Sequence, residues 1–249
     1  MPCSKCGEKN TIRAHLIPQV FCKEVQTGKS HATAVKTDGS FHPTQSGTFD
    51  KNILCATCDG ELGRLEEYAA IVFANIRKGS INRGFGIKEC HGIDKDKILR
   101  FCAGILWKYS ITSEEYGKID LYSYQDEIKK IAFGEIEIPS WFDVALVRLL
   151  IHKQDDEVFA YRAPLNLKKQ NVRLYNFMLG GMVCLVKANK KKMNFGDELS
   201  KILLNQEGEL RYLLAPAEVS EEYRLSKQLA NESSRLSAFL DKQDTTINR

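Results

Sequence analysis

Apolar residues recur at helical spacing in two long stretches of the chain. The first stretch predicts a helix that begins at Cys55 and ends near Arg77, and the second predicts a core helix over residues 95–110. The apolar positions of these stripes are Leu62, Leu65, Ala69, Val72, Phe73 and Ile76, then Ile98, Leu99, Cys102, Ile105, Leu106 and Tyr109. Further helices are predicted over residues 119–131 and 140–152, the latter with Ser140 as its N-cap.

Other segments favour strands and turns. Residues 158–161, 172–178 and 182–186 are rich in β-branched and apolar residues, and the last two segments meet at Gly180-Gly181, which predicts a hairpin. Near the N-terminus, residues 11–17 predict a short strand that Pro18 ends, with His15 close to its end.

The segment 23–51 is polar and contains several turn residues. It predicts a long loop or an irregular hairpin. Loops of this length are uncommon in compact domains unless they carry function. The segment is therefore a candidate to border a site.

The composition is that of a folded soluble protein, because 43% of the 249 residues are hydrophobic and 27% are charged. No basic segment leads into an apolar one at the N-terminus, and no stretch of about 18 apolar residues occurs, so we expect a cytoplasmic protein that neither spans nor binds a membrane. Net charge is +4, and because residues 1–75 hold eight basic and eight acidic residues, the surplus lies in the rest of the chain.

Two cysteine pairs carry the clearest chemical signal. Each pair has the two-residue spacer that lets both sulfurs reach one ion, and four thiolates complete the closed tetrahedral shell of structural zinc. The predicted ligands are Cys3, Cys6, Cys55 and Cys58. The other cysteines, which we expect to be small buried hydrophobic residues, are Cys22, Cys90, Cys102 and Cys184.

The residues between the two pairs point to a family. The chain resembles the treble-clef form of the His-Asn-His (HNH, ββα-metal) endonuclease superfamily over about residues 1–70. The features that carry the resemblance are a strand that ends in His15, the following Ile17-Pro18, then Asn52, and then the second cysteine pair at a helix start. The resemblance implies an enzyme that hydrolyses phosphodiester bonds of DNA, or alternatively of RNA. It also implies that His15 is the general base and that Asn52 orients the loop or the histidine.

In that family a single divalent ion, Mg²⁺ or Mn²⁺, is held by a residue just before the base and by one just after the last zinc cysteine. Here these positions are Ala14, which cannot ligate, and Asp59, which can. Glu66 lies on the same helix face as Asp59, but seven residues rise about 10 Å, too far to share one ion comfortably. Three explanations remain open: a ligand from the loop, water ligands, or an inactive site. The loop candidates are His31, Asp38, His42 and Asp50.

Together these observations predict an α+β fold with an N-terminal zinc-bound unit and a mixed second domain. The predicted boundaries are 1–77, a glycine-rich connector at 78–92, an α+β domain at 93–217, and a polar helix with a tail at 218–249. We expect a nucleic-acid partner, and the resemblance also suggests phage defence or a restriction-like system, with a regulatory protein or a second copy as a further partner. The alternative function is a non-catalytic zinc module that binds nucleic acid or protein.

Overall fold

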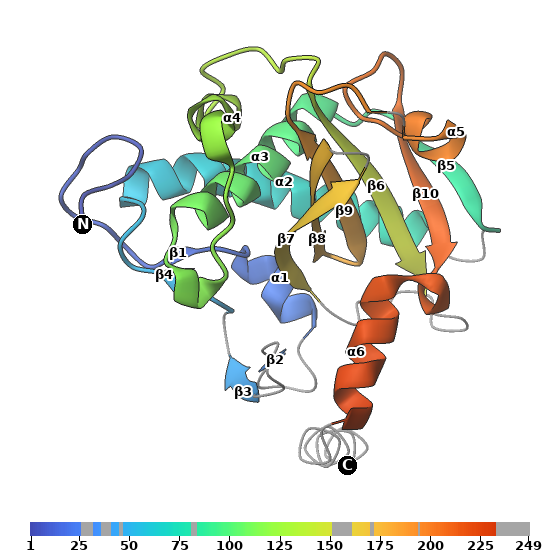
Figure 1. The fold of residues 1–249 in the computed structure, drawn as a ribbon, viewed down its shortest axis with the longest axis horizontal. Helices are drawn as coiled ribbons and strands as arrows, with labels where there is room; N and C mark the ends of the chain where they lie inside the picture. Colours follow the sequence, from blue (N-terminus) through green and yellow to red (C-terminus); the bar gives the residue numbers. More distant parts are fainter. Residues whose placement is uncertain are drawn as a thin grey trace.

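The structure is a computed structural model. It describes residues 1–25, 32–35, 41–44, 47–80, 84–150, 161–169, 172–193 and 195–232. Helices and a mixed sheet lie in separate layers (Figure 1), which confirms the predicted α+β class. Among the described residues, no helix combines the length and the apolar character needed to cross a membrane.

The main sheet has six strands in the order β5-β10-β6-β9-β8-β7. Every neighbouring pair is antiparallel except β10 and β6, which are parallel. The strands are β5 (Gly86–Cys90), β6 (Phe142–Leu150), β7 (Arg162–Lys169), β8 (Val172–Leu179), β9 (Met182–Ala188) and β10 (Leu210–Pro216). The prediction of strands at 172–178 and 182–186 is confirmed, whereas residues 158–160 lie outside the described residues.

Two long helices, α2 and α3, pack side by side against the sheet (Figure 1). The helices are α1 (Gln19–Glu24), α2 (Ala56–Ser80), α3 (Lys95–Ile111), α4 (Gln125–Ala132), α5 (Asp197–Ser200) and α6 (Glu221–Glu232). Asp94 caps α3, because its side chain accepts a hydrogen bond from the Lys97 amide. The two long predicted helices are confirmed, and the predicted helix at 119–131 is a 3₁₀ turn, Tyr122–Tyr124, followed by α4.

The predicted helix over residues 140–152 is wrong, because residues 142–150 form β6, while residues 151–152 lie outside the described residues. β6 lies between β10 and β9, and seven of its nine positions are buried. A strand that is buried on both faces is apolar at nearly every position, so its periodicity cannot distinguish it from a buried helix. Only its place in the centre of the sheet decides the matter.

The hairpin predicted at Gly180-Gly181 is confirmed, and it docks onto the helices. Both glycines have positive φ values, 57° and 71°, as a two-residue turn of this kind requires. A Cβ atom on Gly180 would lie 2.9 Å from the Phe21 ring of α1. Arg77 of α2 donates a hydrogen bond to the Gly180 carbonyl at 2.9 Å and also pairs with Glu24. The Gly180-Gly181 turn therefore joins the sheet to α1 and α2.

The described residues before α2 include four short strands. β1 (Ala14–His15) pairs with β4 (Phe49–Asp50), and β2 (Ala32–Val35) pairs with β3 (Phe41–Thr44), so the segment 23–51 contains the irregular hairpin that was one of its two interpretations. β4, paired with β1, is thus the last strand before α2, and residues 51–55 connect the two elements.

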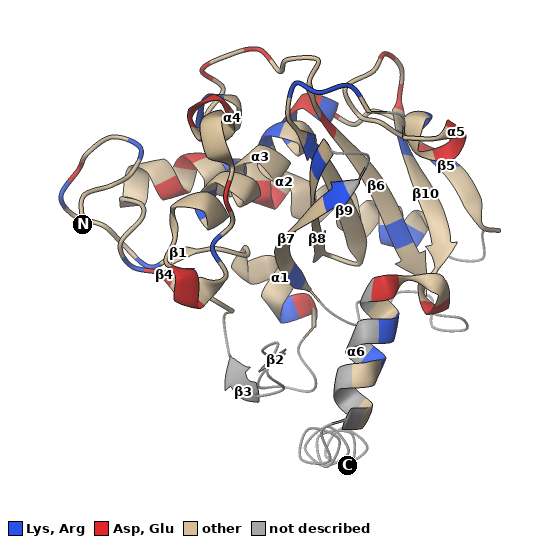
Figure 2. Ribbon diagram, viewed as in Figure 1, with Lys and Arg blue, Asp and Glu red and all other residues tan. Residues whose placement is uncertain are grey.

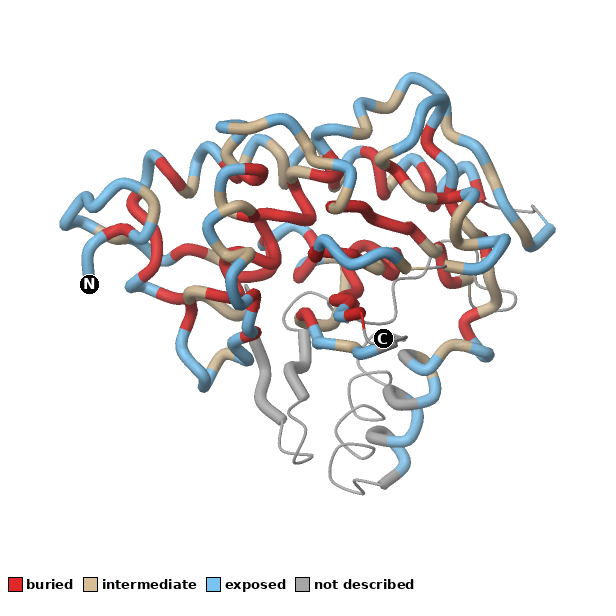
Figure 3. The backbone as a smooth tube through the Cα atoms, turned by 45° about the horizontal axis from the view of Figure 1, so that its top comes forward, coloured by how far each residue is buried: buried red, intermediate tan, exposed pale blue. Residues whose placement is uncertain are grey.

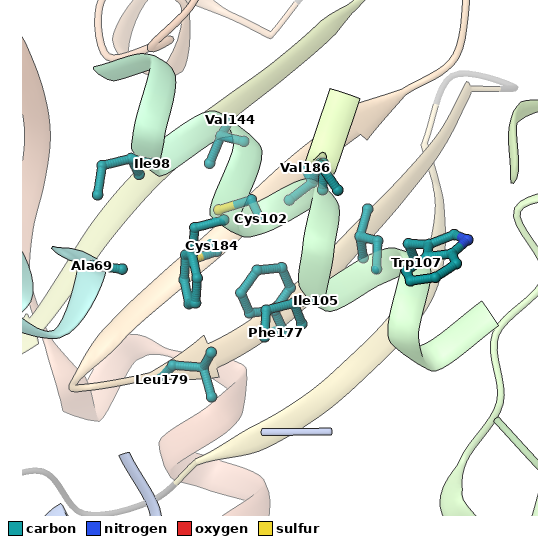
Figure 4. Packing of buried hydrophobic residues seen from close by; sticks show 14 of the residues in the cluster. Ala69, Ile98, Cys102, Ile105, Trp107, Val144, Phe177, Leu179, Cys184 and Val186 are labelled. Carbon is teal, nitrogen blue, oxygen red and sulfur yellow. The ribbon is translucent and has the colours of Figure 1, made fainter. Parts of the chain in front are cut away.

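One cluster of buried hydrophobic residues extends from Cys3 to Leu214, and Figure 3 shows buried positions along both the N-terminal part and the sheet. The division of the chain at 78–92 stays a prediction, but the two parts share this core, and β5 lies inside the predicted connector. Figure 4 shows α3 lying against the sheet. Residues that meet in this layer are Ile98, Cys102, Ile105, Val144, Phe177 and Cys184.

Candidate functional site

The predicted zinc ligands come together. The ligand atoms of Cys3, Cys6, Cys55 and Cys58 all lie within 4.8 Å of one another. The sulfurs of Cys6 and Cys55 are 3.7 Å apart. A tetrahedron with Zn–S bonds of about 2.3 Å has S···S edges of about 3.8 Å. These residues, which we call the cysteine cluster, could therefore bind zinc.

Backbone hydrogen bonds shape the first cysteine pair. The Gly7 amide donates to the Cys3 carbonyl at 2.8 Å, and Gly7 has φ 81°, which allows the turn to close behind Cys6. The Ser4 amide donates to the Ile53 carbonyl at 2.9 Å, two residues before the second pair. The second pair begins α2. The two pairs are therefore held together by backbone as well as by any metal.

The thiols favour a cation. Burial raises the pKa of the Cys58 thiol, and the neighbouring cysteine side chains raise it further. The Cys3 thiol differs, because backbone hydrogen bonds outweigh the effect of its burial and lower its pKa to about 6. Thiolates gathered this closely require a positive charge to compensate them. A Zn²⁺ ion would supply that charge and release the protons, which couples metal binding to folding. Of the other cysteines, Cys22, Cys102 and Cys184 are buried as expected, whereas Cys90 is partly exposed.

His15 lies at the end of β1, opposite Phe49 of β4. Its ring meets the Phe49 ring edge-on, with 6.1 Å between centroids. The Nε2 atom is buried and has no hydrogen-bond partner among the described residues. Burial lowers the pKa of the imidazole, and the positive charge of Lys108 lowers it further. His15 is therefore held neutral with an unused nitrogen, as a general base requires.

Lys108 of α3 holds this site together. Its side chain is 1% exposed, and its ammonium donates to the His15 carbonyl at 2.6 Å and to Glu66 Oε1 at 2.6 Å. The bridge joins the end of β1, the middle of α2 and the C-terminal part of α3. Charge-assisted hydrogen bonds of this length are among the stronger ones in proteins.

Asp59 lies in the first turn of α2 and is half-buried. Burial raises the pKa of its carboxyl group, Lys108 lowers it and Glu66 raises it. Lys108 and Glu66 also act on the pKa of His15. Lys108 and Glu66 therefore link the Asp59 carboxyl group and the His15 imidazole electrostatically.

Asn52 lies between β4 and α2. Its side chain is exposed, and its amide N–H donates to Asp50 Oδ1 at 2.8 Å. Within the described parts of the chain, no hydrogen bond joins Asn52 to His15. Its assigned role as orienter stays a prediction.

The Asp50 carboxylate is used structurally. It accepts a hydrogen bond from the Thr112 hydroxyl at 2.7 Å and lies opposite Ala14 in the β1–β4 pair. The remaining loop candidates, His31, Asp38 and the side chain of His42, fall outside the described residues and side chains.

Sequence reasoning missed Lys108 and treated Glu66 only as a distant metal ligand. The sequence contained a signal for Lys108, because this lysine interrupts the apolar residues of a predicted core helix. The structure buries every position of that helix from Phe101 to Ser110. A lysine in such a place requires a buried partner. Which partner it takes depends on tertiary packing.

Comparison with protein-family models, curated proteins and solved structures found no match to this chain.

Proposed function

We propose that this protein is a metal-dependent, HNH-like endonuclease that hydrolyses phosphodiester bonds of DNA, with His15 as general base. One observation carries the proposal: half-buried His15, at the end of a strand, has a buried Nε2 atom with no hydrogen-bond partner among the described residues, and Lys108 and Glu66 act on both His15 and Asp59, in the first turn of the helix that begins at the cysteine cluster. A histidine packed only for structure would have its nitrogen satisfied, because an unpaired buried polar atom costs free energy.

Each group has a role in this proposal. His15 Nε2 takes a proton from the attacking water. Lys108 acts as a positioning residue, since it binds the His15 carbonyl rather than the imidazole and keeps the ring uncharged. Asp59 offers a half-buried carboxylate, which fits a hard divalent ion such as Mg²⁺ or Mn²⁺, with water completing its shell. When bound, such an ion stabilises the negative charge that develops on the phosphate.

The test is nicking of supercoiled plasmid by purified protein with Mg²⁺ or Mn²⁺, compared with His15→Ala. His91→Ala is the matched control, because the His91 side chain is 73% exposed and lies far along the chain from the cysteine cluster. Zinc content and circular dichroism show whether each variant keeps its fold. We expect His15→Ala to lose at least about 100-fold in rate, the usual contribution of a general base, while His91→Ala keeps its rate. Equal nicking by all three proteins would refute the proposal.

A second function has an observation in its favour. Ala14 is fully buried and pairs with Asp50, and Glu66 is bound to Lys108, so neither supplies a further metal ligand beside Asp59. This favours a zinc module that binds nucleic acid or protein without cleaving it. Such a module would bind nucleic acid equally well with His15 or Ala at this position and would nick no plasmid.

A further inference from the structure

One end of the main sheet carries a group of exposed cations, which we call the basic end. It is formed by the end of β7, the start of β8 and the loop after β9, and Figure 2 shows basic positions gathered there. The exposed side chains that define the basic end are Lys168, Arg173, Lys190, Lys191 and Lys192. These residues lie in three different segments of the chain.

The fold brings these segments together through specific contacts. Lys168 lies directly opposite Arg173 in the β7–β8 pair. Like charges that face each other across a strand pair are destabilising, so this arrangement is not explained by stability. Asn189 links the third segment to the second, because its side-chain amide donates to the Arg173 carbonyl at 2.7 Å and its side-chain oxygen accepts from the Lys191 amide at 3.0 Å.

Most of this charge has no acidic partner in the part of the chain that the structure describes. Lys190 pairs with Glu127 at 2.9 Å. Among the residues that the structure describes, Lys168, Arg173 and Lys191 have no acidic partner within salt-bridge distance, and the same holds for Lys192. Exposed ammonium and guanidinium groups without acidic partners attract a polyanion, and the attraction falls as salt rises.

Aromatic rings border the basic end. The guanidinium of Arg173 lies 3.5 Å from the centre of the Tyr122 ring. Tyr122 is 48% exposed and has φ 53°, a left-handed conformation that non-glycine residues rarely adopt, and its amide N–H is held by Asp120 Oδ1 at 2.6 Å. Lys190 lies near the Tyr124 and Trp141 rings, 6.0 Å and 5.7 Å from their centres. Backbone strain of this kind persists where the surrounding structure fixes it, often at functional sites.

We propose that the basic end binds a single strand of nucleic acid, with the cations on the phosphates and the Tyr122–Arg173 stack beneath a base. Cations combined with exposed aromatic rings are the pattern of single-strand binding, since every base has a face that can stack. An acidic peptide would need the cations but not the ring. The assignment of the bound strand as the substrate rests on the proposed nuclease function.

The position of the basic end suits this role. Tyr175 of β8 donates a hydrogen bond to the Asp120 carbonyl at 2.8 Å, and the Ile119 amide donates to the Tyr109 carbonyl at 3.0 Å. Tyr109 follows Lys108, which binds the His15 carbonyl. The turn that carries Tyr122 is thus joined to the same end of α3 that positions His15.

The experiment measures fluorescence anisotropy of a labelled single-stranded DNA of about 20 nucleotides, longer than the site of one small binding fold, without divalent ions so that no strand is cut. Lys168→Glu/Lys191→Glu is compared with Lys78→Glu/Lys201→Glu, which makes the same change in net charge at exposed positions outside the basic end. We expect the first pair to weaken binding at least about tenfold and to reduce the dependence of affinity on salt, and the control pair to change affinity less than about twofold. Equal weakening by both pairs would overturn the proposal.

Two further comparisons separate the partners and the functions. Tyr122→Ala should weaken binding of DNA while Tyr122→Phe keeps it, and equal affinity of both variants for DNA would overturn the stacking role. Tighter binding of poly-glutamate than of DNA would overturn the choice of partner. Because binding is measured without cleavage, a protein that binds through the basic end but never nicks plasmid would refute the proposed nuclease and leave this inference intact.

Discussion

Replacing Lys108 by methionine tests whether the buried ammonium holds the candidate site together. Methionine keeps most of the side-chain volume and removes the charge and both hydrogen bonds. The Glu66 carboxylate, 19% exposed, then loses its cation, and the His15 carbonyl loses its donor. The variant therefore leaves two polar groups of the site without the partner that the fold gave them.

Removing one partner of a buried ion pair costs about 3–5 kcal/mol. Since Glu66 keeps some contact with water, we expect a loss at the lower end, about 3 kcal/mol, from the free energy of unfolding. With a urea dependence of about 2 kcal/mol per M, the unfolding midpoint should fall by roughly 1.5 M. That is a large share of the about 5–15 kcal/mol that stabilises an ordinary domain.

Urea unfolding of zinc-loaded protein, followed by circular dichroism, measures this effect. Lys97→Met is the matched control, because Lys97 lies on the same helix, pairs with Asp94 and is 50% exposed. Exposed pairs contribute about 0–1 kcal/mol, so the control should lose little. The double variant Lys108→Met/Glu66→Leu should be more stable than the sum of its single changes predicts. Equal stability of Lys108→Met and Lys97→Met would refute the reasoning.

Three further predictions concern the metal, the hairpin and the histidine. Cys58→Ser should lower zinc content below that of the unmodified chain, measured by atomic absorption, and should lower the melting temperature, because a ligand of the cysteine cluster is lost; unchanged zinc content would contradict the assignment of the ligands. Gly180→Ala should lower the melting temperature more than Gly208→Ala, since both positions have positive φ but only the first places a Cβ atom 2.9 Å from the Phe21 ring; equal losses would contradict the close packing. Because burial lowers the folded pKa of His15, its contribution to stability should be complete above about pH 6.5 and be lost as pH falls through the folded value. NMR titration of His15 should give a midpoint below about 6.5, and a higher midpoint would contradict the burial argument.

Local features of the fold follow from the amino-acid sequence alone. The spacing of the cysteine pairs allowed the metal group to be predicted, because two residues between sulfurs suffice to set their reach. Helical periodicity located α2 and α3, since apolar residues recur at helical spacing in both segments. The glycine pair located the β8–β9 turn, because few residues other than glycine adopt positive φ at two successive positions.

Tertiary structure decides which of these helices and strands contact one another. β6 has the composition of a buried helix, and its place between two strands makes it a strand. Lys108 lies 93 residues from His15 along the chain, and no pattern in either segment encodes their contact. The exposed cations of the basic end are ordinary lysines and an arginine until strand register places them together. Local sequence limits backbone conformation, whereas burial, charge pairing and the surroundings of His15 arise from contacts between distant segments.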